Sequence, residues 1–459
     1  MKTYQDLLAL GDNEEARKNF ILEAISEHKS TSLYTTALAA QQYYDGLNPT
    51  IMHYEKVIYD TVGAAHKDKW SANHKIASNF FNFAITQENQ YLLGNGAIFV
   101  DKNTKDKLGA DFEATLQKLG KYALIGGVSF GFWNFDKLEA FSVREFAPLY
   151  DEESGKLMAG IRFWQIDGGK PLRVTLYEID GYTEYIKREG SAIEEYRQKR
   201  PYKLKIASSP ADGDIIYDSE NYANFPIVPL WGNDKKQSEL VGRQGTLDAF
   251  DLLNSNLVNN VDEANYIYWV LTNCDGMTDI DDAKFIERLK TMHVAHADGD
   301  GGNGATAEAH TVEAPFQASE AAIAVIKARL YEDFMCLNVA DLSAGSKTAT
   351  EIRAAYQPLD SKCDMYEYCV IEFVDKILAL AGIDDEVSFK RSRIINTQEE
   401  IQSILSAAEY LDDEFIVKQI CSILGVPDEA EEILNRRKLE ESAKFRFSTA
   451  SNSPQNEDE

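Results

Sequence analysis

One short string in the sequence has the residue types of a phosphate-binding loop. Gly345, Ser346, Lys347 and Thr348 stand in that order. A P-loop requires one glycine directly before its lysine and another five residues earlier, because the backbone amides there surround the phosphates. Those two positions hold Ser346 and Asp341 in this chain. We therefore expect no nucleotide site at this string.

A glycine-rich stretch contains two aspartates whose carboxylates could bind Ca²⁺. Asp298 and Asp300 stand two residues apart there. The EF-hand spacing then requires an oxygen ligand at Gly302, a glycine at Asn303 and a glutamate at Ala309, and none of the three positions fits. This stretch is more typical of a loop tip than of a calcium site.

Two histidines precede this stretch and raise the question of a metal centre. His293 and His296 are three residues apart, and His310 follows later. In an extended segment that spacing points the two rings to opposite faces, and no His-Glu-x-x-His string is present. A cytosolic metal-dependent hydrolase using these two histidines with Asp298 and Asp300 stays an alternative. Otherwise the residues predict no catalytic group, no metal and no cofactor.

The amino-acid composition excludes several classes of protein. The 459 residues include 75 acidic and 47 basic side chains, which gives a formal net charge of −28 and excludes a generic basic DNA-binding domain. No apolar run approaches the roughly 20 residues that span a bilayer, and the first residues lack the pattern of a signal peptide. The five cysteines contain no Cys-x-x-Cys pair, which indicates free thiols in a reducing compartment.

The N-terminal half predicts helices followed by an antiparallel sheet. Asp12 and Glu15 have the spacing of a capping box, and residues 73–93 have the apolar periodicity of a helix. Short strand-like runs then lie at 97–100, 128–135, 141–146, 159–166 and 173–179, with one inserted helix at 111–125. Residues 187–235 are polar and proline-containing, and we interpret them as a boundary.

The C-terminal half predicts two long helices that bracket a small insert. The first has a narrow apolar stripe from Leu247 to Tyr268 and an asparagine-rich remainder, and the second runs over residues 317–337. A helix of the first kind cannot bury itself in a monomer, so it favours packing beside copies of itself.

The residues after the second long helix predict a loop and then more helices. A loop at 338–347 precedes a further helix, which Thr348 and Glu351 cap and which Pro358 should bend or break. A strand-like piece at 387–395, two helices from Thr397 to about 443 and an acidic tail complete the chain. The predicted fold class is α+β, predominantly helical.

The order of these elements resembles the portal proteins of tailed double-stranded DNA bacteriophages, in the branch from long-tailed phages of Gram-positive hosts. The likeness covers roughly residues 43 to 393. Its strings are Tyr-Tyr-Asp-Gly at 43–46, residues 73–94 ending in Tyr-Leu-Leu-Gly, Ala-Pro-Leu-Tyr-Asp at 147–151, Ala-Gly-Ile-Arg-Phe-Trp at 159–164, Phe-Pro-Ile-Val-Pro-Leu at 225–230, and residues 248–260 running into Trp-Val-Leu-Thr at 269–272 with Asp-Gly at 275–276.

The resemblance implies a fold of named parts. They are a wing at 1–235, a first stem helix within 236–269, a clip at 270–315, a second stem helix within 316–338, a tunnel loop at 339–347, a long bent wing helix with a return strand at 348–395, and a crown with an acidic tail at 396–459.

The resemblance also implies a virion component, assembled in the host bacterial cytoplasm, that forms a ring at one capsid vertex. The ring usually has twelve subunits, and the sequence does not decide between twelve and thirteen. Its expected partners are double-stranded DNA in the channel, the terminase large subunit, the major capsid and scaffolding proteins, and the head–tail adaptor, with no membrane. A multimeric capsid or neck protein that lines no DNA channel stays a second alternative.

Specific residues follow from the resemblance and from the charge. A wall that lets DNA slide should be mostly acidic or neutral with a few cations, so Lys327 and Arg329 of the second stem helix are candidates for the channel. The expected tunnel loop consists of Ala340, Asp341, Leu342, Ser343, Ala344, Gly345, Ser346 and Lys347. The clip residues expected to face the terminase and adaptor are Asp275, Gly276, Asp298 and Asp300.

Overall fold

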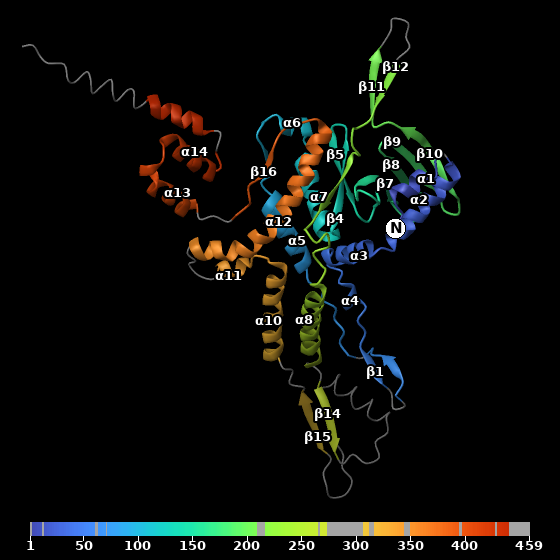
Figure 1. The fold of residues 1–459 in the computed structure, drawn as a ribbon. Helices are drawn as coiled ribbons and strands as arrows, with labels where there is room; N and C mark the ends of the chain where they lie inside the picture. The colour runs from blue at the N-terminus through green and yellow to red at the C-terminus, as the bar shows by residue number, and fades with distance from the viewer. Residues whose placement is uncertain are drawn as a thin grey trace, which may run out of the picture. The chain divides into compact units, whose positions relative to one another are not determined.

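The structure is a computed structural model (Figure 1). It describes residues 2–11, 13–59, 63–69, 71–208, 216–264, 267–272, 306–311, 316–343, 349–393, 397–426 and 429–439. These fall into two compact units, Met1–Leu337 with Pro358–Arg391, and Asn338–Gln357 with Ser392–Glu459. About half of the structure is helix and 19% is strand, so the predicted α+β class with helices in the majority is confirmed.

The first unit begins with four helices whose starts are capped by side chains. These are α1 (Tyr4–Ala9), α2 (Glu14–Lys29), α3 (Ser32–Tyr44) and α4 (Pro49–Met52). The capping residue of α2 is Asn13, which accepts a hydrogen bond from the backbone of Ala16, so the prediction that Asp12 caps this helix was wrong by one residue.

A five-stranded antiparallel sheet lies beside α1 and α2. Its strands are β6 (Phe146–Tyr150), β7 (Leu157–Trp164), β8 (Leu172–Glu178), β9 (Gly181–Lys187) and β10 (Ile193–Arg200), in the order β10-β9-β8-β7-β6. The predicted meander is therefore confirmed for the runs at 159–166 and 173–179, whereas the runs at 97–100 and 128–135 belong to other sheets. Buried residues of α1 and α2, including Leu7 and Ile21, pack on strand residues such as Ile161 and Leu176.

A second sheet combines β4 (Val128–Asn134), β5 (Lys137–Ser142) and β13 (Ile227–Trp231), in the order β13-β4-β5. The predicted strand at 141–146 was wrong, because the Glu145 amide donates to the Ser142 carbonyl and a turn separates β5 from β6. Residues 187–235 are not a boundary either. They contain all of β10 and β13, and the hairpin of β11 (Lys203–Ser208) and β12 (Ile216–Glu220).

Three helices form the main core of this unit. They are α5 (Phe80–Leu93), α7 (Phe112–Gly126) and the part of α12 (Ala349–Ala381) that follows Pro358; the short α6 (Thr104–Leu108) contributes Leu108. Pro358 lies inside a continuous α12, so the predicted break is absent. The α12 residues Tyr366, Phe373 and Ile377 are almost fully buried. Strand β3 (Ala97–Phe99) pairs with β16 (Val387–Phe389) and not with the meander.

Two long helices project from this core, as the sequence predicts. Helix α8 (Gln244–Ala264) leads into β14 (Ile267–Thr272), and β15 (Thr306–Thr311) precedes α10 (Phe316–Phe334). The strands pair antiparallel, with Ile267 opposite Thr311. Because α8 ends at Ala264, Tyr268 lies on β14 and not on the helix stripe where we expected it.

The second unit is helical over its described residues. It contains α11 (Val339–Ser343), the start of α12, α13 (Thr397–Ser406), a 3₁₀ turn (Ala408–Tyr410), α14 (Asp413–Ile423) and a further helical segment at 430–439. Val417, Cys421, Ala430 and Leu434 make a small core.

Two further expectations concern the whole chain. In the ranges that the structure describes, no helix has both the length and the apolar character needed to cross a bilayer. Cys336, Cys363, Cys369 and Cys421 are free thiols.

The packing of α7 against α12 generates a stability prediction. Gly120 of α7 lies where an added Cβ would overlap the Tyr366 hydroxyl and the Asn89 side chain. Alanine ordinarily stabilises a helix interior relative to glycine, but here overpacking should dominate and lower the free energy of unfolding by roughly 1–3 kcal/mol. Denaturant unfolding of Gly120→Ala tests this. The control is Gly245→Ala in α8, where a Cβ meets nothing and no loss is expected.

Candidate functional site

The two long helices pack on each other through an apolar core at one end only. Leu330 and Phe334 of α10 and Leu247 of α8 are buried. Further along, Phe250, Leu257 and the α10 residues Ile323 and Ile326 are only partly buried. The pair therefore has too little buried apolar surface to be held by its own contacts.

A polar stripe on α8 attaches this helix to the body. Asp251, Ser255 and Asn259 are buried and recur every fourth residue, so they lie on one face of the helix. Their oxygens accept hydrogen bonds from the backbone amides of Ser78 (3.0 Å), Ile76 (3.0 Å) and His74 (2.7 Å), respectively. We call residues 73–79 the strap.

We call these three hydrogen bonds between the strap and α8 the ladder. Their geometry follows from two repeat lengths. Alternate residues of an extended chain are about 6.6 Å apart, and residues four apart on a helix are about 6 Å apart. The two spacings nearly match, so three successive amides can meet three successive side chains. This explains why the strap is extended and why α5 begins at Phe80, seven residues after the predicted start at 73.

The start of α8 is held by a second polar group. The Asn48 side-chain amide donates to Asp248 (3.0 Å) and to Asp251 (2.8 Å), and the Tyr43 hydroxyl donates to Asp248 at 2.6 Å. Burial raises the pKa of Tyr43 to about 12 and also raises the pKa of Asp251. Tyr43 therefore stays a donor at any physiological pH.

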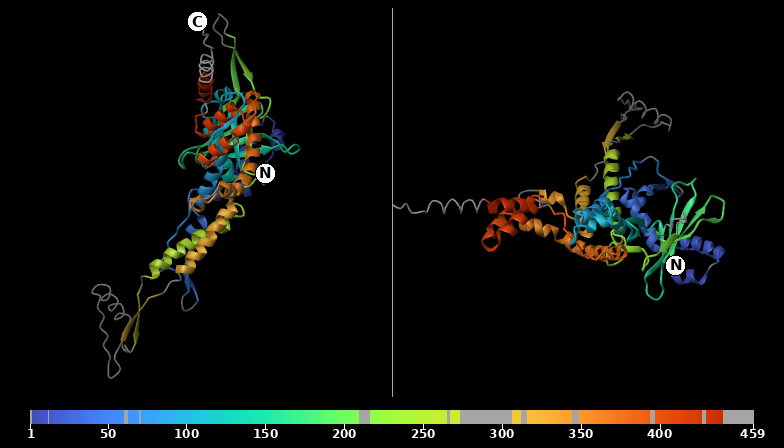
Figure 2. Two further views of the ribbon diagram at one scale, coloured as in Figure 1. Left: turned by 90° about the vertical axis from the view of Figure 1, so that its left-hand side faces the viewer. Right: turned by 90° about the horizontal axis from the view of Figure 1, so that it is seen from above.

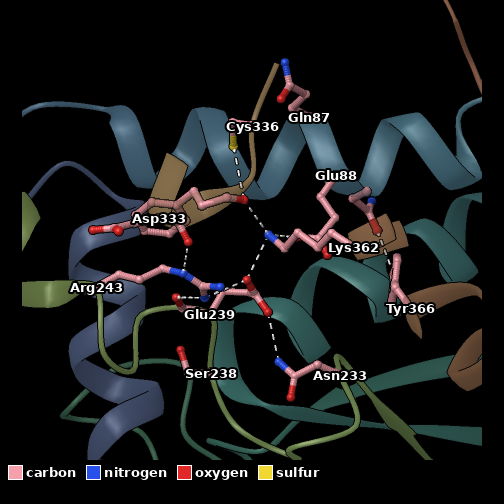
Figure 3. Close-up of polar contacts among 12 residues, drawn as sticks. Gln87, Glu88, Asn233, Ser238, Glu239, Arg243, Asp333, Cys336, Lys362 and Tyr366 are labelled. Atoms are coloured by element: carbon pink, nitrogen blue, oxygen red, sulfur yellow. Dashed lines mark hydrogen bonds and ion pairs between the residues drawn. The ribbon is translucent and has the colours of Figure 1, made fainter. Parts of the chain in front are cut away.

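A buried charge cluster lies beside the end of α10 (Figure 3). The Lys362 ammonium lies 2.6 Å from a Glu88 oxygen and 2.8 Å from a Glu239 oxygen, and the Arg243 guanidinium lies 2.8 Å from the same Glu239 oxygen. The side chains of Glu88, Glu239 and Lys362 are 2%, 4% and 9% exposed. Two basic side chains and two carboxyl groups are thus paired in the interior.

Both cations of this cluster also reach the last carbonyls of α10. Arg243 Nε donates to the carbonyl of Asp333 at 2.6 Å, and Lys362 Nζ donates to the carbonyl of Phe334 at 3.2 Å. A helix C-terminus carries partial negative charge and unpaired carbonyls, so these contacts are favourable. Gln87 then fixes the backbone of Leu337 through two hydrogen bonds. Its side-chain oxygen accepts from the Leu337 amide (2.8 Å), and its side-chain nitrogen donates to the Leu337 carbonyl (3.0 Å).

The two carboxylates of the cluster differ in their environment. Glu239 faces both Lys362 and Arg243 and accepts a hydrogen bond from Asn233, and its pKa is lowered although burial opposes this. Glu88 is completely buried and shares Lys362 with Glu239, so burial raises its pKa to about 7. The two carboxylates raise the pKa of Lys362, which is therefore a permanent cation.

A cavity of about 410 Å³ lies against this cluster. Its lining includes Asp234, Lys235, Arg243, Asp333 and Met335, so both charge signs are present. Within the part of the chain that the structure describes, no group of three metal-binding side chains occurs. The charged groups of the cluster are bonded to one another and to helix α10, which is the arrangement of an anchor for that helix.

The structure places only some of the residues that the sequence singles out. Lys327 and Arg329 lie exposed on α10, and Arg329 pairs with Asp333 at 2.8 Å. Residues 339–343 of the expected tunnel loop form α11, so this part is helix and not loop. The remaining candidates lie outside the described residues: Ala344, Gly345, Ser346, Lys347, Thr348, Asp275, Gly276, Asp298, Asp300, His293 and His296.

Sequence reasoning missed the charge cluster. Glu239 and Arg243 have ion-pair spacing for a helix, but they precede α8 in a segment that is not helical. Lys362 stands between Leu359, Cys363 and Tyr366, which are buried positions of α12, and a lysine within such a stripe was the available signal.

The family model and the similar curated proteins agree on one family. Residues 23–443 match the family described as phage portal protein, SPP1 Gp6-like. The portal protein of Bacillus phage SPP1 is 22% identical over 428 residues, covering 85% of this chain and 80% of the relative. That of Clostridium phage phiCD119 is 21% identical over 405 residues, covering 81% and 87%.

Solved structures also match this chain. A chain from the neck of a native GTA particle computed with C12 symmetry aligns with a TM-score of 0.40 and 11% identity over 76% of this chain and 90% of that one. A chain from the neck of an empty GTA particle computed with C6 symmetry has a TM-score of 0.41 and the same identity and coverage.

The raised pKa of Glu88 predicts a pH-dependent stability. A carboxyl group whose pKa rises from 4.5 to about 7 on folding binds its proton more tightly in the folded state, so stability falls as pH rises through that window. Glu88→Gln keeps the neutral form at every pH. When the pH is raised from 5 to 8, the free energy of unfolding of the parent should fall by about 2 kcal/mol more than that of Glu88→Gln.

Urea unfolding at the two pH values measures this difference. Glu153→Gln removes an exposed carboxylate at a turn and is the control for a change of surface charge. A difference between parent and Glu88→Gln that is equal at pH 5 and pH 8 would contradict a raised pKa for Glu88.

Proposed function

The chain belongs to the SPP1 Gp6-like phage portal protein family, and from this premise we propose that it forms a ring at one capsid vertex. The portal role itself is supported by the family match along most of the chain and by the two phage portal relatives. The ring would be the conduit for DNA during packaging and ejection. It would be a virion component assembled in the host cytoplasm.

The observation that carries the ring proposal is the thin core of the α8–α10 pair. Beyond Leu247, Leu330 and Phe334, the apolar stripe of both helices stays partly exposed in the single chain. Helices of this kind gain burial when copies stand side by side around an axis. We infer that α8 and α10 are the stem of the ring, with residues 270–315 as its clip.

The charge of the chain favours a channel that does not hold DNA. Tight non-specific binding to DNA requires lysines and arginines that displace counterions from phosphates. The net charge of −28 opposes this, and of the two candidate cations on α10, Arg329 is already paired with Asp333. Lys327 is the exposed cation left to meet DNA in the stem.

Within this proposal we assign a mechanical role to the charge cluster around Lys362. Lys362 and Arg243 hold the last carbonyls of α10, and Gln87 holds Leu337, two residues before the expected tunnel segment at 339–347. A fixed start would let the tunnel segment act on DNA without moving the stem. The portal family is structural, and we propose that this chain is not an enzyme.

The remaining partners are expectations of the same proposal. The clip at 270–315 would meet the terminase large subunit during packaging and the head–tail adaptor afterwards. The wing and the C-terminal helices from residue 396 onward would meet the major capsid and scaffolding proteins.

Replacing residues 340–346 by a Gly/Ser linker of equal length tests the tunnel assignment. Rings should still form, because the stem and its anchor are untouched, but DNA-filled capsids should fall at least tenfold in a packaging assay. The control replaces residues 167–170, an exposed turn of the wing, in the same way. Normal packaging by the first variant would count against residues 339–347 as the tunnel segment.

A further inference from the structure

The hairpin of β1 (Val57–Tyr59) and β2 (Ala65–Lys67) has no core behind it. All six of its residues are exposed. The register sets Val57 opposite Lys67 and Tyr59 opposite Ala65, so these four side chains share one face, and Ile58 and His66 share the other. An isolated two-stranded hairpin is at best marginally stable in water. This hairpin therefore needs a surface to lie on.

The exposed side chains of the hairpin are mainly apolar. Val57 and Tyr59, which share one face, are 50% and 73% exposed, and Ile58 on the other face is 42% exposed. Single exposed apolar residues are ordinary, but neighbouring ones on one face mark an interaction surface. The one polar member of the apolar face, Lys67, is already paired with Glu55, so that face brings no uncompensated charge to a partner.

The hairpin is attached to one flank of the stem. Its first residue follows Lys56, which pairs with Glu263 near the end of α8 at 3.2 Å, and the strap that follows it runs along the same helix. Figure 1 and the right view of Figure 2 show α8 between this hairpin on one side and α10 on the other. The hairpin and the outward face of α10 are thus on opposite flanks of one chain.

The outward face of α10 has the properties of a complementary surface. Val325 is 67% exposed at its centre, and Ala321 and Ala328 lie one turn to either side, also exposed. Small side chains around Val325 leave room for a tyrosine ring. Glu320 near the start of this helix and Lys69 after the hairpin are both exposed and opposite in charge.

We propose that the β1–β2 hairpin of each copy docks on the outward face of α10 in the next copy. A closed ring requires heterologous contacts, in which two different surfaces of the same chain meet. The Val57–Tyr59 face and the Val325 face lie on opposite flanks. The first is mainly apolar, and the second is apolar apart from Arg329, whose charge is paired with Asp333. The inference rests on the ring proposed above and names the surfaces that join its subunits in the stem.

Cysteine cross-linking tests the contact directly. Tyr59→Cys and Val325→Cys are combined in the full chain, and the purified rings are treated with a short bis-maleimide. A ladder of covalent dimers and larger species on a denaturing gel is expected. Each single variant, and Tyr59→Cys combined with Ile166→Cys on the exposed wing, should give monomer with at most traces of dimer.

A second measurement uses a variant that removes apolar surface alone. Tyr59→Ser should raise the protein concentration for half-maximal ring assembly at least tenfold, and the exposed control Ile166→Ser should leave it unchanged within twofold. If rings form by native mass spectrometry but no ladder appears and Tyr59→Ser assembles like the parent, the docking is wrong and the portal ring stands. If the parent forms no rings, both are contradicted.

Discussion

The long α8–α10 hairpin buries little apolar surface between its own two helices, and the packing of the surrounding segments compensates for this. Helices α8 and α10 share a core only around Leu330 and Phe334. Elsewhere they are held by polar contacts made by other segments. The strap follows a buried polar stripe of α8, and the charge cluster holds the end of α10.

The strap and the charge cluster stabilise the two helices in different ways. The strap gives α8 a polar seam, in which amides of an extended segment satisfy buried Asp251, Ser255 and Asn259. The charge cluster gives α10 a fixed end, because Lys362 and Arg243 complement the partial negative charge of its C-terminus. Burying these charges is costly unless they are paired, which explains why Glu88 and Glu239 accompany them. Both devices leave the outer faces of the helices available for neighbouring copies.

The sequence predicts those parts of the fold in which local patterns dominate. The inserted helix α7, the meander and the two long helices follow from periodicity and turn residues. Asparagine-rich α8 was correctly expected to depend on partners, but the ladder with the strap was not predictable, because it pairs residues about 180 positions apart. The short turn between β5 and β6 and the late start of α5 were missed for similar reasons: a few hydrogen bonds decide them. The cluster around Lys362 joins four separate segments, which no local pattern reveals.

Native mass spectrometry of the purified protein is the decisive test of whether this chain closes into a ring through its stem. We expect an assembly of twelve or thirteen copies of the 51.6 kDa chain, about 619 kDa for twelve, with a central hole in negative-stain images of the same sample. A species that stays a monomer or dimer at high concentration, also in the presence of scaffolding protein, would contradict it.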